Sequence, residues 1–385
     1  MKAPSPERVA EFAAAARRIV VERSNAADVV TQLLRDTPRE EWLSLAGRPE
    51  LRNNGALEQL SRQIDAALDR QPQDALPLSL LATKIADSLP DDQYPAVVTA
   101  QVRAHAWKDR AQALTFNGKH EEALHAIETA ETLLRSFGTV AHDEAIVRFV
   151  KATVLQSVRR FEESQSLLAA CREVFLEHGD RRRLIACGIA EGMLLFRRGE
   201  FTGAIEVFAP LVEVAQTSHD MSALAAIHNN IGFCLLEKHD VTSANIHFSE
   251  AIARLNDLGK SVDALRTEMA IGRLLISKGQ SAHGLVKLRR ARTQFLANHL
   301  AEEAAICGLD IAAVLLVEDR DREAKELVDT IMSDLRSAQL NDRSRAALEY
   351  LERELEAHDA TPAIVRQASE FLQRKRIEST DVIAI

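Results

Sequence analysis

The chain has 385 residues, of which 46% are hydrophobic, 4% aromatic and 27% charged, and its net charge is −9. Abundant alanine, leucine, glutamate and arginine with few aromatic residues favour helices over sheets, and the apolar share is large enough for a sizeable core. The acidic balance, with bases interspersed, argues against a nucleic-acid partner, because phosphate binding needs a concentrated basic face.

Membrane, metal and redox motifs are missing from the sequence. No run approaches the roughly 18 uninterrupted apolar residues of a transmembrane helix. The segment 1–20 interleaves alanine with Glu and Arg and lacks the apolar region and cleavage site of a secretion signal. The four cysteines are isolated, so they indicate small buried side chains: Cys171, Cys187, Cys234 and Cys307. We expect a cytoplasmic protein with no membrane contact, no metal and no other cofactor.

Residues 1–95 are expected to form an N-terminal helical cap. Helical patterns cover 5–24 and 26–36, and residues 37–42 read as a cap followed by a short helix. The segments 56–70 and 77–89 then form a degenerate hairpin. A basic recognition helix and the usual Gln and Gly turn residues of a helix-turn-helix are missing, so DNA binding is not favoured.

A forty-residue repeat occupies residues 96–340. A small residue recurs at intervals of 41, 40, 40, 40 and 40; a larger apolar residue follows it by four, and another small residue precedes it by twelve. The recurring small residues are Ala123, Ser164, Ala204, Ala244, Gly284 and Ala324. The larger ones are Ile127, Leu168, Phe208, Phe248, Leu288 and Val328. The preceding small ones are Ala111, Ala152, Gly192, Gly232, Gly272 and Ala312.

This spacing predicts six helical hairpins. Small residues at facing positions let two antiparallel helices approach closely, and the larger residue packs over the next turn. A short turn separates the two helices of each hairpin. It contains Gly118, Gly199 or Gly279 in three copies, whereas Arg159, His239 and Asp319 stand there in the others, so those turns need not use a left-handed glycine.

The pattern resembles the tetratricopeptide repeat (TPR). The first copy matches that motif through Trp107, Ala111, Leu114, Gly118, Ala123, Ile127 and Ala130, and the third through Gly192, Gly199, Ala204 and Phe208. The usual unit has about 34 residues. The longer period is similar to that of long-repeat members in bacterial signal-sensing regulators and motor light chains, although the terminal proline of the motif is mostly missing. The resemblance implies an all-α, right-handed α-solenoid of TPR-like helical hairpins with helical caps.

Residues 341–385 are expected to close the array. The segments 344–358 and 362–376 form a final helix pair, with the basic residues 374–376 near a helix carboxyl end, where cations suit the dipole. The terminal segment 377–385 is expected to be loose.

Four His-Asp pairs admit two interpretations. A metal-dependent hydrolase could use such pairs, but Asp143, Asp220 and Asp240 stand where helices should begin, which favours N-capping. The pairs are His142-Asp143, His219-Asp220, His239-Asp240 and His358-Asp359. Nucleotide-binding glycine motifs, a zinc-protease motif and a nucleophile elbow are all missing. We therefore do not expect an enzyme.

The candidate functional surface is the inner groove, which the first helix of each hairpin lines in the TPR fold. A register-related stripe there mixes aromatic, methionine and long polar side chains, which suits a peptide or protein segment. The candidates are Lys108, Gln112, Gln156, Met193, Phe196, Asn229, Asn230, Phe233, Met269 and Arg273. The resemblance implies that groove asparagines hold a peptide backbone, which implicates Asn229 and, at its border, Asn230.

Alternatives remain open at this point. The two amides could instead bond to neighbouring helices and stitch the array together. The predicted function is a non-enzymatic interaction scaffold; the alternative is a peptide-responsive regulatory module that controls a transcription or signalling partner. The sequence leaves the oligomeric state open.

Overall fold

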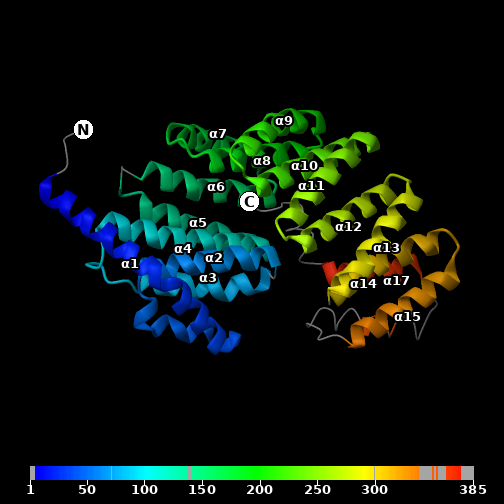
Figure 1. Cartoon of the computed structure of the whole chain (residues 1–385), viewed down its shortest axis with the longest axis horizontal. Coiled ribbons are helices and arrows are strands. Elements are labelled where there is room, and N and C mark those ends of the chain that lie inside the picture. The colour runs from blue at the N-terminus through cyan, green and yellow to red at the C-terminus, as the bar shows by residue number, and fades with distance from the viewer. Residues whose placement is uncertain are drawn as a thin grey trace. The chain divides into compact units, whose positions relative to one another are not determined.

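The computed structural model describes residues 5–70, 72–137, 140–298, 300–337, 349–350, 353 and 361–373. Within those ranges every regular element is a helix (Figure 1), which confirms the predicted all-α class. None of the described helices is both long enough and apolar enough to cross a bilayer. The predicted helix 344–358 lies mostly outside these ranges, and residues 374–385 lie wholly outside them.

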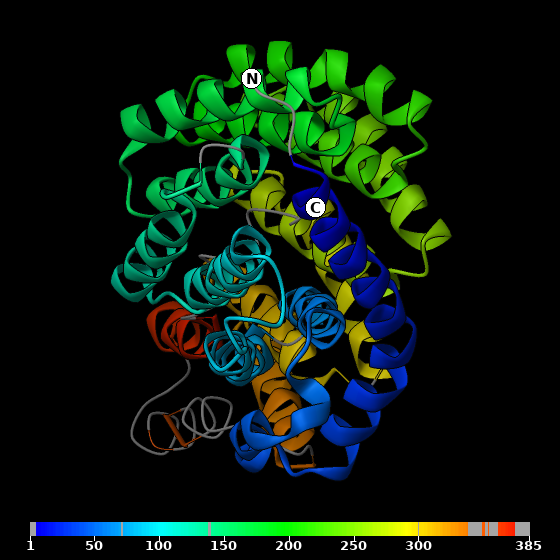
Figure 2. The same cartoon turned by 90° about the vertical axis from the view of Figure 1, so that its left-hand side faces the viewer.

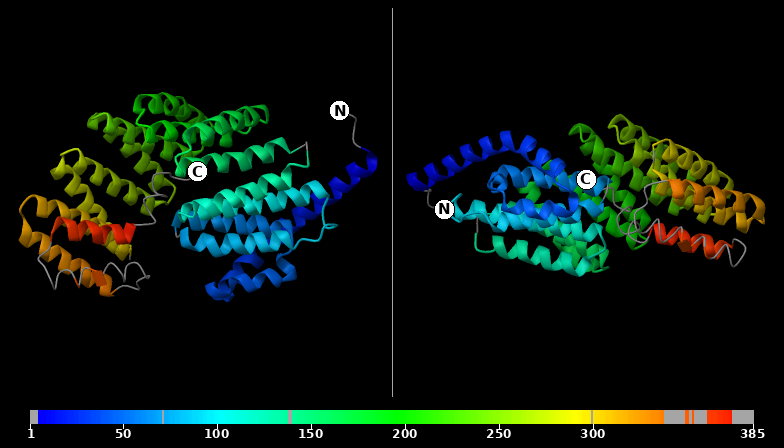
Figure 3. Two further views of the ribbon diagram at one scale, coloured as in Figure 1. Left: turned by 180° about the vertical axis from the view of Figure 1, so that it is seen from behind. Right: turned by 90° about the horizontal axis from the view of Figure 1, so that it is seen from below.

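The N-terminal elements are α1 (Pro6–Asp36), the 3-10 helices η1 (Arg39–Gly47) and η2 (Pro49–Leu51), α2 (Asn54–Arg70), α3 (Pro72–Asp87), α4 (Ala96–Phe116) and α5 (His120–Leu134). The next elements are α6 (Ala141–Ser157), α7 (Phe161–Glu177), α8 (Arg181–Arg197), α9 (Phe201–Thr217) and α10 (Met221–Glu237). They continue with α11 (Val241–Asp257), α12 (Ser261–Ser277), α13 (Ser281–Ala297), α14 (Ala301–Val317), α15 (Asp321–Ser337) and α17 (Pro362–Gln373). Consecutive helices pair as antiparallel hairpins, as Figure 3 shows for the α10–α11 and α12–α13 pairs.

The chain divides into two compact units, one up to Ala190 and one from Glu191 onward. The boundary falls within α8, in the third predicted repeat. The predicted division into a cap, six repeats and a C-terminal pair stays a prediction.

Two N-terminal expectations differ from the structure. The predicted segments 5–24 and 26–36 are joined in one helix, α1, which begins at Pro6 and which Figure 2 shows unbroken. Neither Gly nor Pro interrupts this helix after its first residue, and Asn25 alone does not end it. The second helix of the degenerate hairpin begins at Pro72 rather than at residue 77, so Pro77 lies inside α3.

The turns that join helices α6 to α15, within and between the repeats, share one geometry. Helices α6 to α15 are equal in length, each with 17 residues, and the connections between them are equally short. Each helix with its turn therefore fills half of the predicted repeat. The middle residue of each described connection has φ between 55° and 79° at positions 159, 179, 199, 219, 239, 259, 279 and 319. Half of these residues are not glycine, namely Arg159, His219, His239 and Asp319, so the left-handed conformation is kept even where glycine is absent.

Hydrogen bonding explains why that conformation is kept. The N–H of the residue after the left-handed position donates to a carbonyl five positions back, as from Asp220 to Ala215 at 3.0 Å and from Asp240 to Leu235 at 2.9 Å. This is the Schellman motif, which satisfies carbonyls that the helix end leaves free. Asp220 and Asp240 then cap the following helices by accepting from the N–H of Ala223 and Ser243.

Residue size is matched across each hairpin. A Cβ atom at Gly192 would lie 2.3 Å from Phe208 Cε1, and one at Gly232 would lie 2.6 Å from Phe248 Cε1. Where the repeat has alanine in place of these glycines, the residue sixteen positions later is smaller than phenylalanine, as with Val328 after Ala312. The close approach predicted for the small residues is confirmed at these glycines.

Candidate functional site

The ten candidates lie on the first helices of successive hairpins and divide between the two units. Lys108, Gln112 and Gln156 belong to the first unit, and Met193, Phe196, Asn229, Asn230, Phe233, Met269 and Arg273 belong to the second. Helices α10 and α12 contact each other. We call Asn229 and Phe233 of α10 together with their equivalents one repeat later, Met269 and Arg273 of α12, the candidate face.

Both asparagines of α10 are buried. Asn229 is 6% exposed and Asn230 is 5% exposed, so exposure does not distinguish a groove amide from a border amide. Asn229 Oδ1 is itself buried, and no donor among the described residues bonds to it. Leaving a buried amide oxygen unpaired costs about 1–3 kcal/mol, so this atom is poised to accept a hydrogen bond.

The apolar candidates pack within the second unit. Phe233 meets Phe248 edge-on at a centroid distance of 5.0 Å, and Phe196 meets Phe201 at 5.4 Å. Met269 is buried in the hydrophobic cluster around α14. These side chains therefore contribute to packing, the alternative role that mixed apolar stripes often have.

Arginine–carboxylate bonds join α12 to α14. Arg273 Nε donates to Asp310 Oδ2 at 2.5 Å, and Arg266 Nη2 donates to Glu303 Oε1 at 3.3 Å. Burial raises the pKa of Asp310, while the Arg273 guanidinium opposes that rise. Arg273 Nη2 is also buried, and no described residue accepts its hydrogens. The candidate face thus holds both an unpaired acceptor, on Asn229, and an unpaired donor, on Arg273.

Candidates of the first unit lie on α4 and α6, which contact each other. Gln156 is 4% exposed, and its Nε2 donates to Ser164 Oγ at 3.2 Å and to the carbonyl of Ala190 at 3.1 Å. Lys108 Nζ lies 2.5 Å from Asp109 Oδ1, on the adjacent residue. Gln112 is half-buried in α4. Gln156 therefore links three helices and is satisfied by that role.

The His-Asp pairs behave mainly as helix caps. Asp220 and Asp240 cap α10 and α11, whereas Asp143 lies in the first turn of α6, where it accepts from Gln101 Nε2 at 2.7 Å. His142 bonds to Asp180 of the next hairpin at 3.0 Å and not to its chain neighbour. Among the residues that the structure describes, no three His, Cys, Asp or Glu side chains are placed to hold a metal ion. The His358-Asp359 pair lies outside those residues.

Two kinds of polar contact were not predicted from the sequence. Both α12–α14 bonds join an arginine to an acid 37 positions later, which is one helical turn less than the repeat. His228 Nδ1 lies 3.0 Å from His247 Nδ1, across the α10–α11 hairpin. Burial lowers the pKa of both histidines, and each lies near Glu250, which opposes that change. A search for charge pairs near the repeat spacing could have found the first kind, whereas the histidine pair leaves no such signal.

Sequence comparison finds a partial relative. No family model matches the chain. The transcriptional activator NprA of Geobacillus stearothermophilus is 26% identical over 134 residues, which is 35% of this chain and 33% of the activator. The match thus spans about a third of the curated relative's length.

Solved structures share the fold. A signal-transduction ATPase with a TPR sensor from Pyrococcus horikoshii has a TM-score of 0.54 at 10% identity, over 93% of this chain and 52% of that one. Aspartyl phosphate phosphatase F of Bacillus subtilis gives 0.51 at 11% identity, over 82% and 77%. The Rap conjugation gene regulator of plasmid pLS20, complexed with the Phr* peptide, gives 0.50 at 16% identity, over 91% and 94%. The chain therefore has a TPR-like all-α fold.

Proposed function

We propose that the chain is a non-enzymatic, peptide-responsive regulatory module whose candidate face binds a peptide and thereby controls a protein partner. The observation that carries this proposal is the buried, unpaired Oδ1 of Asn229. A bound peptide would supply the missing donor through a backbone N–H. Peptide backbones present N–H and C=O groups together, so the same complementarity holds whichever way the Asn229 amide is turned.

Arg273 supports the same site. Its Nη2 donor is buried and unpaired among the described residues, while its Nε is held by Asp310. A carbonyl or carboxylate of a bound peptide would accept from this guanidinium and would compete with Asp310 for it.

The similar proteins support a regulatory role. One of them is a gene regulator in complex with a peptide, another carries a TPR sensor, and the partial sequence relative is a transcriptional activator. Such roles favour the peptide-responsive module over the constitutive scaffold that the sequence alone favoured. A stack of repeats also suits a sensor, because each repeat touches only its neighbours and small changes at each interface add along the stack.

The test is a peptide selection from a displayed random library against the full chain. Selected peptides should bind wild type and should lose on the order of tenfold in affinity with Asn229→Ala, as expected for a lost buried hydrogen bond. The matched control is Asn245→Ala, an exposed asparagine of α11. Solution scattering should change when peptide is added, whereas a constitutive scaffold should capture its partner without that change.

Measurements of unfolding distinguish an Asn229 amide that binds peptide from one that bonds to neighbouring helices. Since Asn229 Oδ1 has no described donor, Asn229→Ala should leave the unfolding midpoint unchanged or raise it. A variant that lowers the midpoint while peptide affinity stays at the wild-type value would mean that the amide stitches helices together, and the binding proposal would be wrong.

A further inference from the structure

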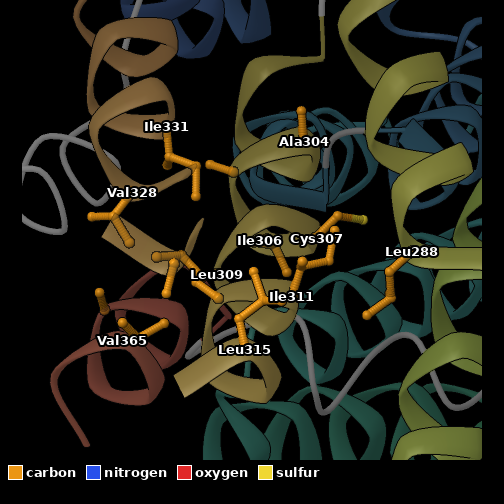
Figure 4. Close-up of a cluster of buried hydrophobic side chains, with 14 of the residues drawn as sticks. Leu288, Ala304, Ile306, Cys307, Leu309, Ile311, Leu315, Val328, Ile331 and Val365 are labelled. Atoms are coloured by element: carbon orange, nitrogen blue, oxygen red, sulfur yellow. The ribbon is translucent and has the colours of Figure 1, made fainter. Parts of the chain in front are cut away.

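The C-terminal helix α17 lies against the first helix of the last described hairpin. It packs on α14 through one face, on which Ile364, Val365 and Ala368 are 8%, 0% and 0% exposed. Figure 1 shows α17 running beside α14, and Figure 4 shows Val365 within the cluster that α14 and α15 form. Thr361 begins the helix by accepting from the N–H of Ile364 at 3.3 Å.

Helix α17 contacts α14 at the position equivalent to Asn230, next to the equivalent of Asn229. Two repeat steps relate Asn229 and Asn230 of α10 to Leu309 and Asp310 of α14. Ser369 of α17 lies 3.4 Å from Asp310 Oδ1. On α14, then, a helix of the chain itself contacts the position next to the one at which the proposed function puts a peptide on α10.

A chain of polar contacts links that helix to the candidate face. Asp310 accepts hydrogen bonds from Ser369 Oγ on Oδ1 and from Arg273 Nε on Oδ2, so one carboxylate bonds to both α17 and the candidate face. Charge-assisted bonds of this kind are about twice as strong as neutral ones. If a ligand takes over Arg273, Asp310 loses its counter-charge in a site whose burial already disfavours its ionised form.

We propose that α17 is a displaceable internal ligand of α14, released when a peptide on the candidate face draws Arg273 away from Asp310. Release uncovers the apolar stripe of Ile364, Val365 and Ala368 and offers it to a partner protein. This inference rests on the proposed function for its trigger, but the docking and its coupling to Arg273 are testable with no peptide present.

The first experiment is hydrogen exchange of the full chain, followed at residues 362–373. Arg273→Gln removes the charge that holds Asp310 and should speed exchange there roughly ten- to hundredfold, while α10 keeps its wild-type rate. The control is Arg322→Gln, because Arg322 is 92% exposed on its side chain and pairs with Glu326 of its own helix. Exchange within twofold of wild type in Arg273→Gln would overturn the coupling.

The second experiment undocks α17 without touching the candidate face. Val365→Asp puts a charge at a fully buried position. A synthetic peptide of residues 361–373 should bind this full-length variant and should not bind wild type, whose α14 is already occupied. If Val365→Asp instead unfolds α10 and α12, α17 is a structural cap and the proposal fails. Loss of the coupling alongside intact peptide selection at Asn229 would overturn this inference and leave the proposed function standing.

Discussion

Replacement of Gly232 by alanine tests the size matching between hairpin helices. A Cβ atom there would lie 2.6 Å from Phe248 Cε1 and 2.7 Å from Cδ1, whereas ordinary contact begins near 3.4 Å. The ring of Phe248, which is 2% exposed, must therefore shift by about 0.8 Å within a packed core. Such overpacking costs about 1–3 kcal/mol, against a gain of about 1 kcal/mol from helix propensity. We expect Gly232→Ala to lose up to about 2 kcal/mol.

The matched control is Gly203→Ala in α9. A Cβ at Gly203 meets Leu195 Cδ1 at 3.7 Å, which is ordinary contact, so propensity alone should act and stability should rise by about 0.5–1 kcal/mol. Urea unfolding followed by circular dichroism measures both variants. Phe248→Leu, introduced into the Gly232→Ala chain, should recover part of the loss, and a double-mutant cycle gives the coupling. Equal stabilisation by the two alanines, or no recovery with leucine, would refute the reasoning.

Three further predictions concern pH, a helix cap and the turns. Because the folded-state pKa values of His228 and His247 lie below the unfolded value near 6.5, wild-type stability should fall as pH drops from 6.5 through the folded values, and His228→Asn should flatten that decline in melting experiments. Asp220→Ala should lose about 1 kcal/mol in urea unfolding, through the N-cap of α10. Gly179→Ala, at φ 65°, should destabilise by about 1–2 kcal/mol, whereas His219→Gly, at φ 55°, should be neutral or stabilising; the opposite order would contradict the turn argument.

Much of the fold was predictable because the residues that determine it lie close together in the sequence and recur in each repeat. The small residue at Gly232 and the larger one at Phe248 recur at a fixed distance, so six weak signals add to a strong one. The left-handed turns at Arg159 and Asp319 were not predicted, because the Schellman bonds outweigh the local preference of those side chains. The continuity of α1 was not predicted either, because Asn25 resembles a break, although it does not end a helix without Gly or Pro beside it.

The candidate site was predictable only in part, because side-chain partners come from other helices. Periodicity put Asn229 and Arg273 on one stripe, but it gave no sign that Arg273 bonds to Asp310 or that Gln156 is already satisfied by Ser164. The sequence predicted that residues 362–376 help to close the array, but it did not predict that α17 packs on α14, because that contact lies outside the repeat.

The uniform lengths of helices and turns have a consequence for how such a chain can grow or shrink. Because equal helices alternate with equal turns, excising or duplicating one whole repeat, for example 221–260, joins a turn to the start of an equivalent helix. The remaining turns and glycine–phenylalanine contacts keep their geometry after such a change, because each involves only one hairpin and its neighbour. Excision removes side chains such as Asn229, since they occur once, and duplication doubles them. The number of repeats can therefore change while the geometry of the helices and turns stays the same. Single substitutions then decide which repeat binds a ligand.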